Sequence, residues 1–160
     1  MHLPLNPSQV MTILLCVSNI LTYALIEYPY FELIQQNSKS KISFTFIIAI
    51  FYAFAFISGF YASYIDPEDP IVQEQILCQK TGEKFDDSPY EYYCHVCKVC
   101  VNDGSKHCKE CNKCVLKFDH HCRWLNNCIG AKNYKPFIVF IVSAEAGLIF
   151  KFVVQVIGCR

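Results

Sequence analysis

The sequence predicts a mainly α-helical integral membrane protein, in which a transmembrane helix bundle carries one small lobe of short β-hairpins and loops. Two observations lead to this fold class. First, 53% of the 160 residues are apolar and only 18% are charged, a composition that excludes a disordered chain. Second, eight of the 11 cysteines lie between Cys94 and Cys128, whereas residues 42–65 contain no Asp, Glu, Lys or Arg. The apolar helices and the cysteine-rich segment are therefore separate parts of the chain.

The first two membrane spans are predicted from uncharged runs. At about 1.5 Å of rise per residue, residues 42–65 are long enough to cross the roughly 30 Å hydrocarbon core of a bilayer as a helix. Residues 10–26 form a shorter run, near the lower limit for a span. A cleaved secretory signal is the alternative for this run, but residues 1–9 contain no Lys or Arg and no A-x-A cleavage pattern follows.

A third apolar stretch, residues 136–158, is predicted to be the last span, although Glu145 and Lys151 interrupt it. These two residues lie about 240° apart around a helix, so they do not pair with each other. Charged side chains at such a depth usually face a bundle interior or an aqueous cavity. An amphipathic or partner-packed helix end is the alternative to a span here.

The predicted organisation has three parts, and the middle part is expected to be cytosolic. Four basic residues close to the third span support this orientation, because positive residues beside a span favour the cytosolic side. They are Lys117, Arg123, Lys132 and Lys135. The three parts are an amino-terminal segment of residues 1–65 with spans at about 10–26 and 42–65, a polar loop of residues 66–135 with a cysteine-rich domain at about 91–135, and a third span at 136–160.

The cysteine spacing of the loop is typical of structural zinc sites. In the reducing cytosol, clustered cysteines act as metal ligands or catalytic thiols, whereas an inverted topology would allow disulfides. The pairs Cys94-x2-Cys97 and Cys108-x2-Cys111 lie about fourteen residues apart, with histidines between and behind them. Thiolates at this spacing fold onto one tetrahedral ion, which supplies folding energy that a short polar segment cannot gain from a core. An iron–sulfur cluster is the alternative, but the histidines favour zinc.

The formal charge of the chain does not favour a nucleic-acid partner. Fourteen Lys and Arg residues balance 14 Asp and Glu residues, so there is no excess positive charge to attract phosphates. We therefore expect no nucleic acid as a partner of this protein. The predicted spans make the lipid bilayer its expected partner.

The string Asp119-His120-His121-Cys122 is a candidate for catalytic chemistry, because eight cysteines and four histidines exceed the eight ligands that two zinc sites use. If this backbone is extended, His120 and Cys122 point to one side and His121 to the other. A cysteine with an ordinary pKa of about 8.5 is mostly protonated at neutral pH, and a neighbouring imidazole raises its reactive fraction. An aspartate can fix the tautomer of that imidazole. The alternative is that all four residues are zinc ligands or scaffolding.

From Cys94 to Phe137 the sequence resembles the DHHC family of protein S-acyltransferases, integral membrane enzymes that attach palmitate and related fatty acids to cysteines of cytosolic proteins. The motifs that carry the resemblance are Cys94-x2-Cys97, His107-Cys108-x2-Cys111-x2-Cys114, Asp119-His120-His121-Cys122, Trp124, Asn127-Cys128-Ile129-Gly130 and Asn133-Tyr134.

The resemblance implies two structural Zn²⁺ ions, with acyl-CoA (palmitoyl-CoA) as the co-substrate. It implies that Cys122 takes the acyl group as a thioester and passes it to cysteines of membrane-associated proteins. His120 is then the base, Asp119 orients His120, and Trp124 contributes an apolar wall to the acyl-CoA site. The implied ligands are Cys94, Cys97, His107 and Cys114 for one ion, and Cys108, Cys111, His121 and Cys128 for the other. The implied location is an endomembrane, the endoplasmic reticulum or Golgi, with the cysteine-rich lobe in the cytosol.

The sequence also departs from the family pattern. Residues 101–104 stand where the family has a basic, proline-containing stretch, and Arg123 replaces a proline. The family has four spans followed by a Thr-Thr-x-Glu motif, whereas this sequence stops at Arg160, so we expect a fragment or a truncated member in which Glu145 and Lys151 lack their partners. A non-catalytic, zinc-stabilised membrane adaptor is the alternative function.

Overall fold

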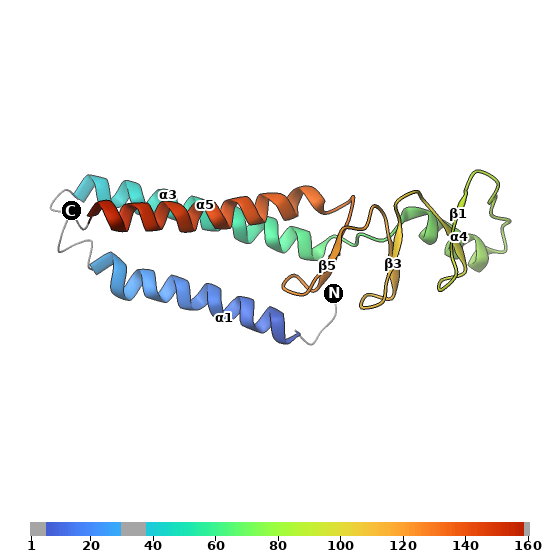
Figure 1. Ribbon diagram of the computed structural model, residues 1–160, viewed down its shortest axis with the longest axis horizontal. Coiled ribbons are helices and arrows are strands. Elements are labelled where there is room, and N and C mark those ends of the chain that lie inside the picture. The colour runs from blue at the N-terminus through green and yellow to red at the C-terminus, as the bar shows by residue number, and fades with distance from the viewer. Residues whose placement is uncertain (1–5, 30–37, 159–160) are drawn as a thin grey trace. The chain divides into compact units, whose positions relative to one another are not determined.

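The structure is a computed structural model that describes residues 6–29 and 38–158. Cys159 and Arg160, at the end of the predicted third span, lie outside the described residues. The chain forms two compact units, which we call the helical unit (Met1–Phe60 and Pro136–Arg160) and the lobe (Tyr61–Lys135). Figure 1 shows the long helices of the first and the paired strands of the second. The predicted fold class, a mainly α-helical membrane protein with a cysteine-rich lobe of short hairpins, is confirmed.

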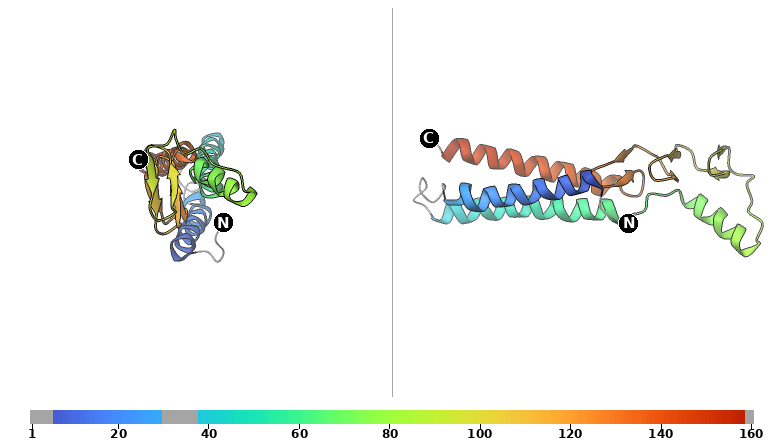
Figure 2. Two further views of the ribbon diagram at one scale, coloured as in Figure 1. Left: turned by 90° about the vertical axis from the view of Figure 1, so that its right-hand side faces the viewer. Right: turned by 90° about the horizontal axis from the view of Figure 1, so that it is seen from below.

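Among residues 6–29 and 38–158, three helices are long and apolar enough to cross a membrane, as the sequence predicts. Their mean hydropathies are 1.8, 2.1 and 2.2 over Pro7–Glu27, Ile42–Tyr64 and Tyr134–Val156, respectively. The first consists of helix α1 (Pro7–Thr22) and a π-helical turn η1 (Tyr23–Glu27), the second is α3 (Ser38–Tyr64), and the third is α5 (Tyr134–Gly158). Figure 2 shows the same helices from two further sides.

Helix α1 begins at a capping box. The Asn6 side chain accepts a hydrogen bond from the backbone N–H of Gln9 at 2.7 Å, and the Gln9 side chain accepts from the Asn6 N–H at 3.1 Å. Pro7 follows at the first helical position, where its missing N–H costs nothing. Local chemistry therefore starts the first span three residues earlier than its uncharged run predicts.

Helices α3 and α5 pack closely through glycines and phenylalanines. A Cβ atom at Gly59 would lie 2.9 Å from Phe140 Cδ2, and one at Gly147 would lie 3.2 Å from Phe51 Cβ. The rings of Phe51 and Phe150 have centroids 6.2 Å apart. Since apolar side chains gain little from leaving lipid for another helix, close backbone approach at small residues is what holds such helices together.

Lys151 of α5 has a partner within the helical unit, which corrects the expectation that it lacks one. Its Nζ lies 2.9 Å from Glu27 Oε1 and 3.3 Å from Asn19 Oδ1, and both partners belong to the first span. The Tyr52 hydroxyl of α3 donates to the same Asn19 oxygen at 2.8 Å. The expectation was based on partners from a fourth span, whereas the observed partners of Lys151 belong to the first span. The spacing of charges along one helix does not predict an ion pair with a residue of another helix.

The lobe contains three β-hairpins of three-residue strands. They are β1 (Tyr92–Cys94) with β2 (Val99–Val101), β3 (Lys106–Cys108) with β4 (Lys113–Val115), and β5 (His120–Cys122) with β6 (Asn127–Ile129). Each hairpin is a separate two-stranded antiparallel sheet. Such short sheets bury too little apolar surface to be stable alone, so their stability must come from elsewhere.

A helix that the sequence analysis did not predict, α4 (Pro70–Thr81), covers the first hairpin. Asp69 caps its N-terminus, Pro70 occupies the first turn, and Gly82 at φ 78° ends it in the left-handed conformation. These are ordinary start and stop signals, so the helix was readable from the sequence. Gln75 of α4 donates to the carbonyl of Cys100 at 2.7 Å and accepts from its N–H at 2.8 Å, which satisfies the outer edge of β2.

Buried Asp69 connects α4 to residues 101–104, the stretch that departs from the family pattern. Its carboxylate accepts hydrogen bonds from the Asn102 backbone N–H at 2.8 Å, the Asn102 side chain at 2.7 Å and the Ser105 hydroxyl at 2.6 Å. It also accepts from the N–H of Ile71 at 3.1 Å. A fully buried carboxylate is tolerated because four donors replace its water. Asn102 and Ser105 therefore have a structural role in this chain.

Candidate functional site

The first cluster of potential metal ligands joins the first hairpin to the second. The side chains of Cys94, Cys97, His107 and Cys114 place one ligand atom each within 4.8 Å of the others. Cys97 Sγ lies 3.2 Å from His107 Nδ1 and 3.6 Å from Cys114 Sγ, and Cys114 Sγ lies 4.0 Å from the same nitrogen. Atoms at the corners of a zinc tetrahedron with bonds of about 2.0–2.3 Å are separated by comparable distances.

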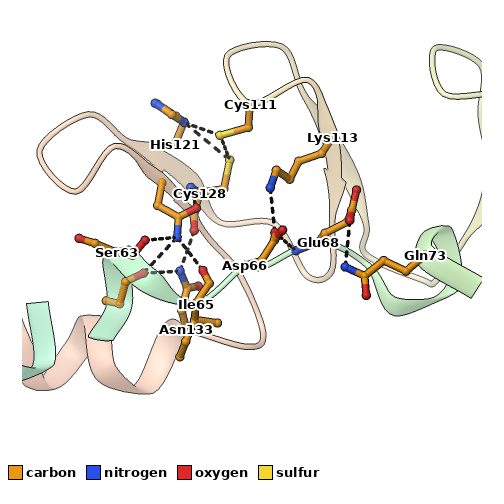
Figure 3. A network of polar contacts seen from close by, with 12 residues as sticks. Ser63, Ile65, Asp66, Glu68, Gln73, Cys111, Lys113, His121, Cys128 and Asn133 are labelled. Carbon is orange, nitrogen blue, oxygen red and sulfur yellow. Dashed lines mark hydrogen bonds and ion pairs between the residues drawn. The ribbon is translucent and has the colours of Figure 1, made fainter. Parts of the chain in front are cut away.

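The second cluster joins the second hairpin to the third in the same way. It contains Cys108, Cys111, His121 and Cys128, again within 4.8 Å of one another. His121 Nδ1 lies 3.3 Å from Cys111 Sγ, 3.6 Å from Cys128 Sγ and 3.9 Å from Cys108 Sγ. Figure 3 shows His121, Cys111 and Cys128 pointing toward one another.

Strand alternation explains how one hairpin serves two clusters. His107 and Cys108 are neighbours on β3, so their side chains point to opposite faces. His107 enters the first cluster and Cys108 the second. The structure thus brings together the same two interleaved sets of four residues that the family resemblance implies. Consecutive hairpins are linked into a chain by the clusters and not by a shared sheet.

The donor sets fit zinc in their chemistry. Each has three thiols and one imidazole, a combination common in structural zinc sites. A hydrogen bond from Cys128 and the nearby His121 lower the pKa of Cys111 to about 5, against the opposing effect of burial. The hydrogen bond with Cys111 and burial raise the pKa of Cys128. A metal ion that binds here must displace the proton retained by Cys128, so binding is coupled to proton release.

Cys122 lies outside both clusters, although His121 beside it belongs to the second. All three residues His120–Cys122 form strand β5, so the alternation considered for an extended backbone applies. His120 and Cys122 therefore lie on one face of the strand and His121 on the other. The Cys122 residue is only 7% exposed, and its thiol is free.

Asp119 and His120 form the other half of the candidate catalytic group. His120 Nδ1 lies 3.2 Å from Asp119 Oδ2, and the two side chains are 43% and 53% exposed in that order. A carboxylate that accepts from Nδ1–H makes Nε2 the nitrogen of the imidazole that can accept a proton. The arrangement therefore places an imidazole that contacts a carboxylate on the same strand face as the Cys122 thiol.

Trp124, proposed as an apolar wall for acyl-CoA, occupies the turn between β5 and β6. It is 54% exposed. Phe118, in contrast, packs against a small core of Cys108, Val115 and Cys128. The two aromatic residues near the candidate nucleophile thus have different surroundings.

Two asparagines that the sequence analysis did not assign attach the third hairpin to the last turn of α3. The side-chain amide of Asn127 donates to the carbonyls of Ala62, Ser63 and Ile65 at 3.1, 3.1 and 2.7 Å. The Asn133 amide donates to the carbonyl of Ala62 at 3.0 Å and to that of Cys128 at 2.8 Å. The last carbonyls of a helix have no partner within the helix, so these amides satisfy them.

The segment between α3 and α4 reinforces this attachment. Asp66 accepts a hydrogen bond from Lys113 Nζ at 2.8 Å, and the backbone N–H of Asp69 donates to the carbonyl of Cys114 at 2.9 Å. Figure 3 shows Asp66 and Lys113 facing each other. Burial opposes the ionisation of Asp66, but the hydrogen bonds from Lys113 and Glu68 outweigh it and lower the pKa of Asp66. Burial lowers the pKa of Lys113, but the hydrogen bond to Asp66 and the negative charges of Asp66 and Glu68 together raise it above its ordinary value.

Comparison with known families supports the resemblance read from the motifs. A model of the DHHC palmitoyltransferase domain matches residues 87–160, which include all three hairpins and α5. No curated protein matches the chain.

Proposed function

We propose that this protein, whose residues 87–160 match a model of the DHHC palmitoyltransferase domain, is a protein S-acyltransferase. It transfers a fatty acyl group from acyl-CoA to cysteines of membrane-associated proteins through a thioester on Cys122. The observation that carries the proposal is that Cys122 is left out of both clusters while the next residue enters one, and that His120 on the same strand face is bonded to Asp119.

The reaction consists of two thioester exchanges. In the first, Sγ of Cys122 gives its proton to His120 and attacks the thioester carbonyl of acyl-CoA. The bond between that carbonyl and the CoA sulfur breaks, and CoA leaves as a thiol after taking the proton. In the second, a substrate cysteine gives its proton to His120 and attacks the acyl carbonyl. The bond between that carbonyl and Sγ of Cys122 breaks, and Cys122 takes the proton back from His120. A base that holds and returns one proton is sufficient, because each step exchanges one thioester for another.

The two metal clusters have a structural role in this proposal. Zinc, when bound, supplies the folding energy of the lobe and holds β5 in place. His121 and Cys128 take part directly, because they pair with each other across the third hairpin. Removal of the ion from the second cluster is therefore expected to displace Cys122, although that ion takes no part in the chemistry of Cys122.

The proposed reaction requires a membrane. At about 0.8 kcal/mol per buried CH₂, a palmitoyl chain gains roughly 12 kcal/mol from leaving water, so it is held in apolar surroundings. Three apolar helices in the same chain fit this requirement. We further propose that the lobe is cytosolic, that the host membrane is an endomembrane such as the endoplasmic reticulum or Golgi, and that residues 91–135 form the zinc domain.

The direct test is acylation of the whole chain in lipid nanodiscs with a labelled palmitoyl-CoA. Hydroxylamine-labile label is expected on the wild-type chain and is lost in Cys122→Ser. Cys100→Ser is the matched control, since Cys100 is a partly buried thiol outside both clusters. Full labelling of Cys122→Ser would exclude the proposal. A wild-type chain that holds two metal ions and takes no label would instead support the adaptor function.

A further inference from the structure

The three hairpins of the lobe are copies of one ten-residue unit with a period of fourteen residues. Each copy has two three-residue strands joined by a four-residue turn. The copies have the same register at the position beside the turn, where the Cα partners are Cys94↔Val99, Cys108↔Lys113 and Cys122↔Asn127. They also agree at the middle position, with Tyr93↔Cys100, His107↔Cys114 and His121↔Cys128.

The turns of the three copies share an uncommon backbone conformation. The last turn residue has a positive φ in each copy, 56° at Lys98, 50° at Asn112 and 51° at Asn126. Only a few per cent of non-glycine residues adopt such angles, so three at equivalent positions indicate one turn structure. In the first copy this turn directs the N–H of Cys97 to Cys94 Sγ at 3.4 Å. The third copy therefore has the backbone of a zinc knuckle, a turn whose first and fourth residues bind one ion.

The repeat assigns a position to the two free thiols of this region. In copies one and two, the first and fourth knuckle residues are cluster cysteines, and the next copy supplies the histidine and the last cysteine. The third copy supplies His121 and Cys128 to the second cluster, but its own knuckle reads Cys122 and Leu125. Cys100 is the last cysteine of the first copy, which has no knuckle before it. Cys122 and Cys100 thus occupy ligand positions of the repeat, at its last and first copies, for which the chain provides no complete cluster.

We propose that β5–β6 is a third zinc knuckle from which one ligand is missing, and that Leu125, at the position of Cys97 and Cys111, keeps Cys122 free of metal. Both residues are buried, Cys122 at 7% and Leu125 at 6% exposure, so an apolar side chain occupies the place of the second thiolate. One thiolate does not hold zinc, whereas two at knuckle spacing begin a site. The exclusion of metal by Leu125 does not depend on the proposed function. That this exclusion leaves the Cys122 thiol available for acylation does rest on the proposed function.

The test restores the missing ligand. Leu125→Cys and Leu125→His chains are purified in nanodiscs under reductant, and bound Co²⁺ is counted by mass spectrometry and by the thiolate-to-cobalt absorption band. We expect the count to rise from two to three ions per chain in at least one variant, and to return to two in Cys122→Ser/Leu125→Cys. Arg123→Cys, which adds a thiol one residue after Cys122 and outside the knuckle position, should keep two ions.

The first two ions report on folding, so a variant that retains them is folded. If both Leu125 variants retain two ions and gain no third, the proposal is overturned. The same variants separate this inference from the proposed function, because the metal count requires no acyl-CoA. If Cys122 is the acylated residue, Leu125→Cys should also lose labelling in the presence of zinc and regain it after mild chelation that removes only the third ion.

Discussion

Asn127 lies directly opposite Cys122 in the third hairpin, and its side-chain amide donates to three carbonyls at the end of α3. The strand that pairs with the candidate nucleophile is thereby attached to the last turn of an apolar helix. The Oδ1 atom of Asn127 also accepts a hydrogen bond from the backbone N–H of Cys128 at 2.9 Å. The buried side chain opposite Cys122 thus contacts both a potential metal ligand and the end of a helix.

We predict that Asn127→Ala destabilises the lobe by about 1–3 kcal/mol, because the substitution leaves buried carbonyls without donors. Asn127→Asp should cost more, since a carboxylate would face the same carbonyls. Thermal unfolding of the reconstituted chain measures both changes. The exposed turn substitution Asn112→Gly is the control and should have little effect, because glycine adopts the φ of 50° without strain. Unchanged unfolding of Asn127→Ala would contradict the role of the amide.

A second prediction concerns the ion pair between Lys151 and Glu27. Lys151→Met should destabilise the helical unit by about 3 kcal/mol, because it leaves a largely buried carboxylate without its cation. The double variant Glu27→Gln/Lys151→Met should recover most of that loss. Unfolding of the nanodisc-reconstituted chain in denaturing detergent measures both. Glu145→Gln, at an exposed position on the same helix, should change stability by less than about 0.5 kcal/mol. If the stability change of the double variant equals the sum of the changes in Glu27→Gln and Lys151→Met, the two residues are not coupled.

Metal content should depend on membership of a cluster and not on the number of cysteines. Cys114 and Cys100 are the last cysteines of two equivalent hairpins, but only Cys114 belongs to a cluster. Cys114→Ala should lose one ion and unfold the first two hairpins, because a structural zinc supplies about 10–16 kcal/mol of folding energy. Cys100→Ala should retain both ions. Native mass spectrometry distinguishes the two, and loss of an ion from Cys100→Ala would disprove the assigned sets.

The pair of Asp66 and Lys113 predicts a pH dependence at the acid end. Asp66 has a pKa below its ordinary value of 3.8 in the folded chain. Its contribution to stability is therefore complete above pH 3.8 and is lost as the pH falls through the lower, folded-state pKa. Because the pair is partly exposed, the contribution should be at most about 1 kcal/mol.

Asp66→Asn tests this dependence. The variant should be less stable than the wild type at pH 6, and the difference should shrink as the pH falls below 3.8. Urea unfolding at a series of pH values measures the difference directly. A constant difference across the series would mean that Asp66 acts through packing and not through its charge.

Features that depend on local spacing could be read from the sequence. The three spans follow from the length of the apolar runs, and the two knuckles follow from Cys-x2-Cys spacing. Helix α4 was readable too, from Asp69-Pro70 at its start and Gly82 at its end, but the polar composition of the loop obscured it. The grouping of ligands into two interleaved sets came from the family resemblance and not from the spacing, which allows several groupings.

The sequence by itself determined which segments are apolar enough to span a membrane and which residue types can bind a metal, because both depend on neighbours along the chain. Only the tertiary structure decided that the Asn127 amide donates to the carbonyl of Ala62, 65 residues before it, and that Lys151 pairs with Glu27 of another helix. It also showed that the third hairpin has the backbone of the first two. These relationships join polar groups far apart in sequence. The need to satisfy a buried donor, acceptor or charge selects its partner in space, and local pattern carries no information about that choice.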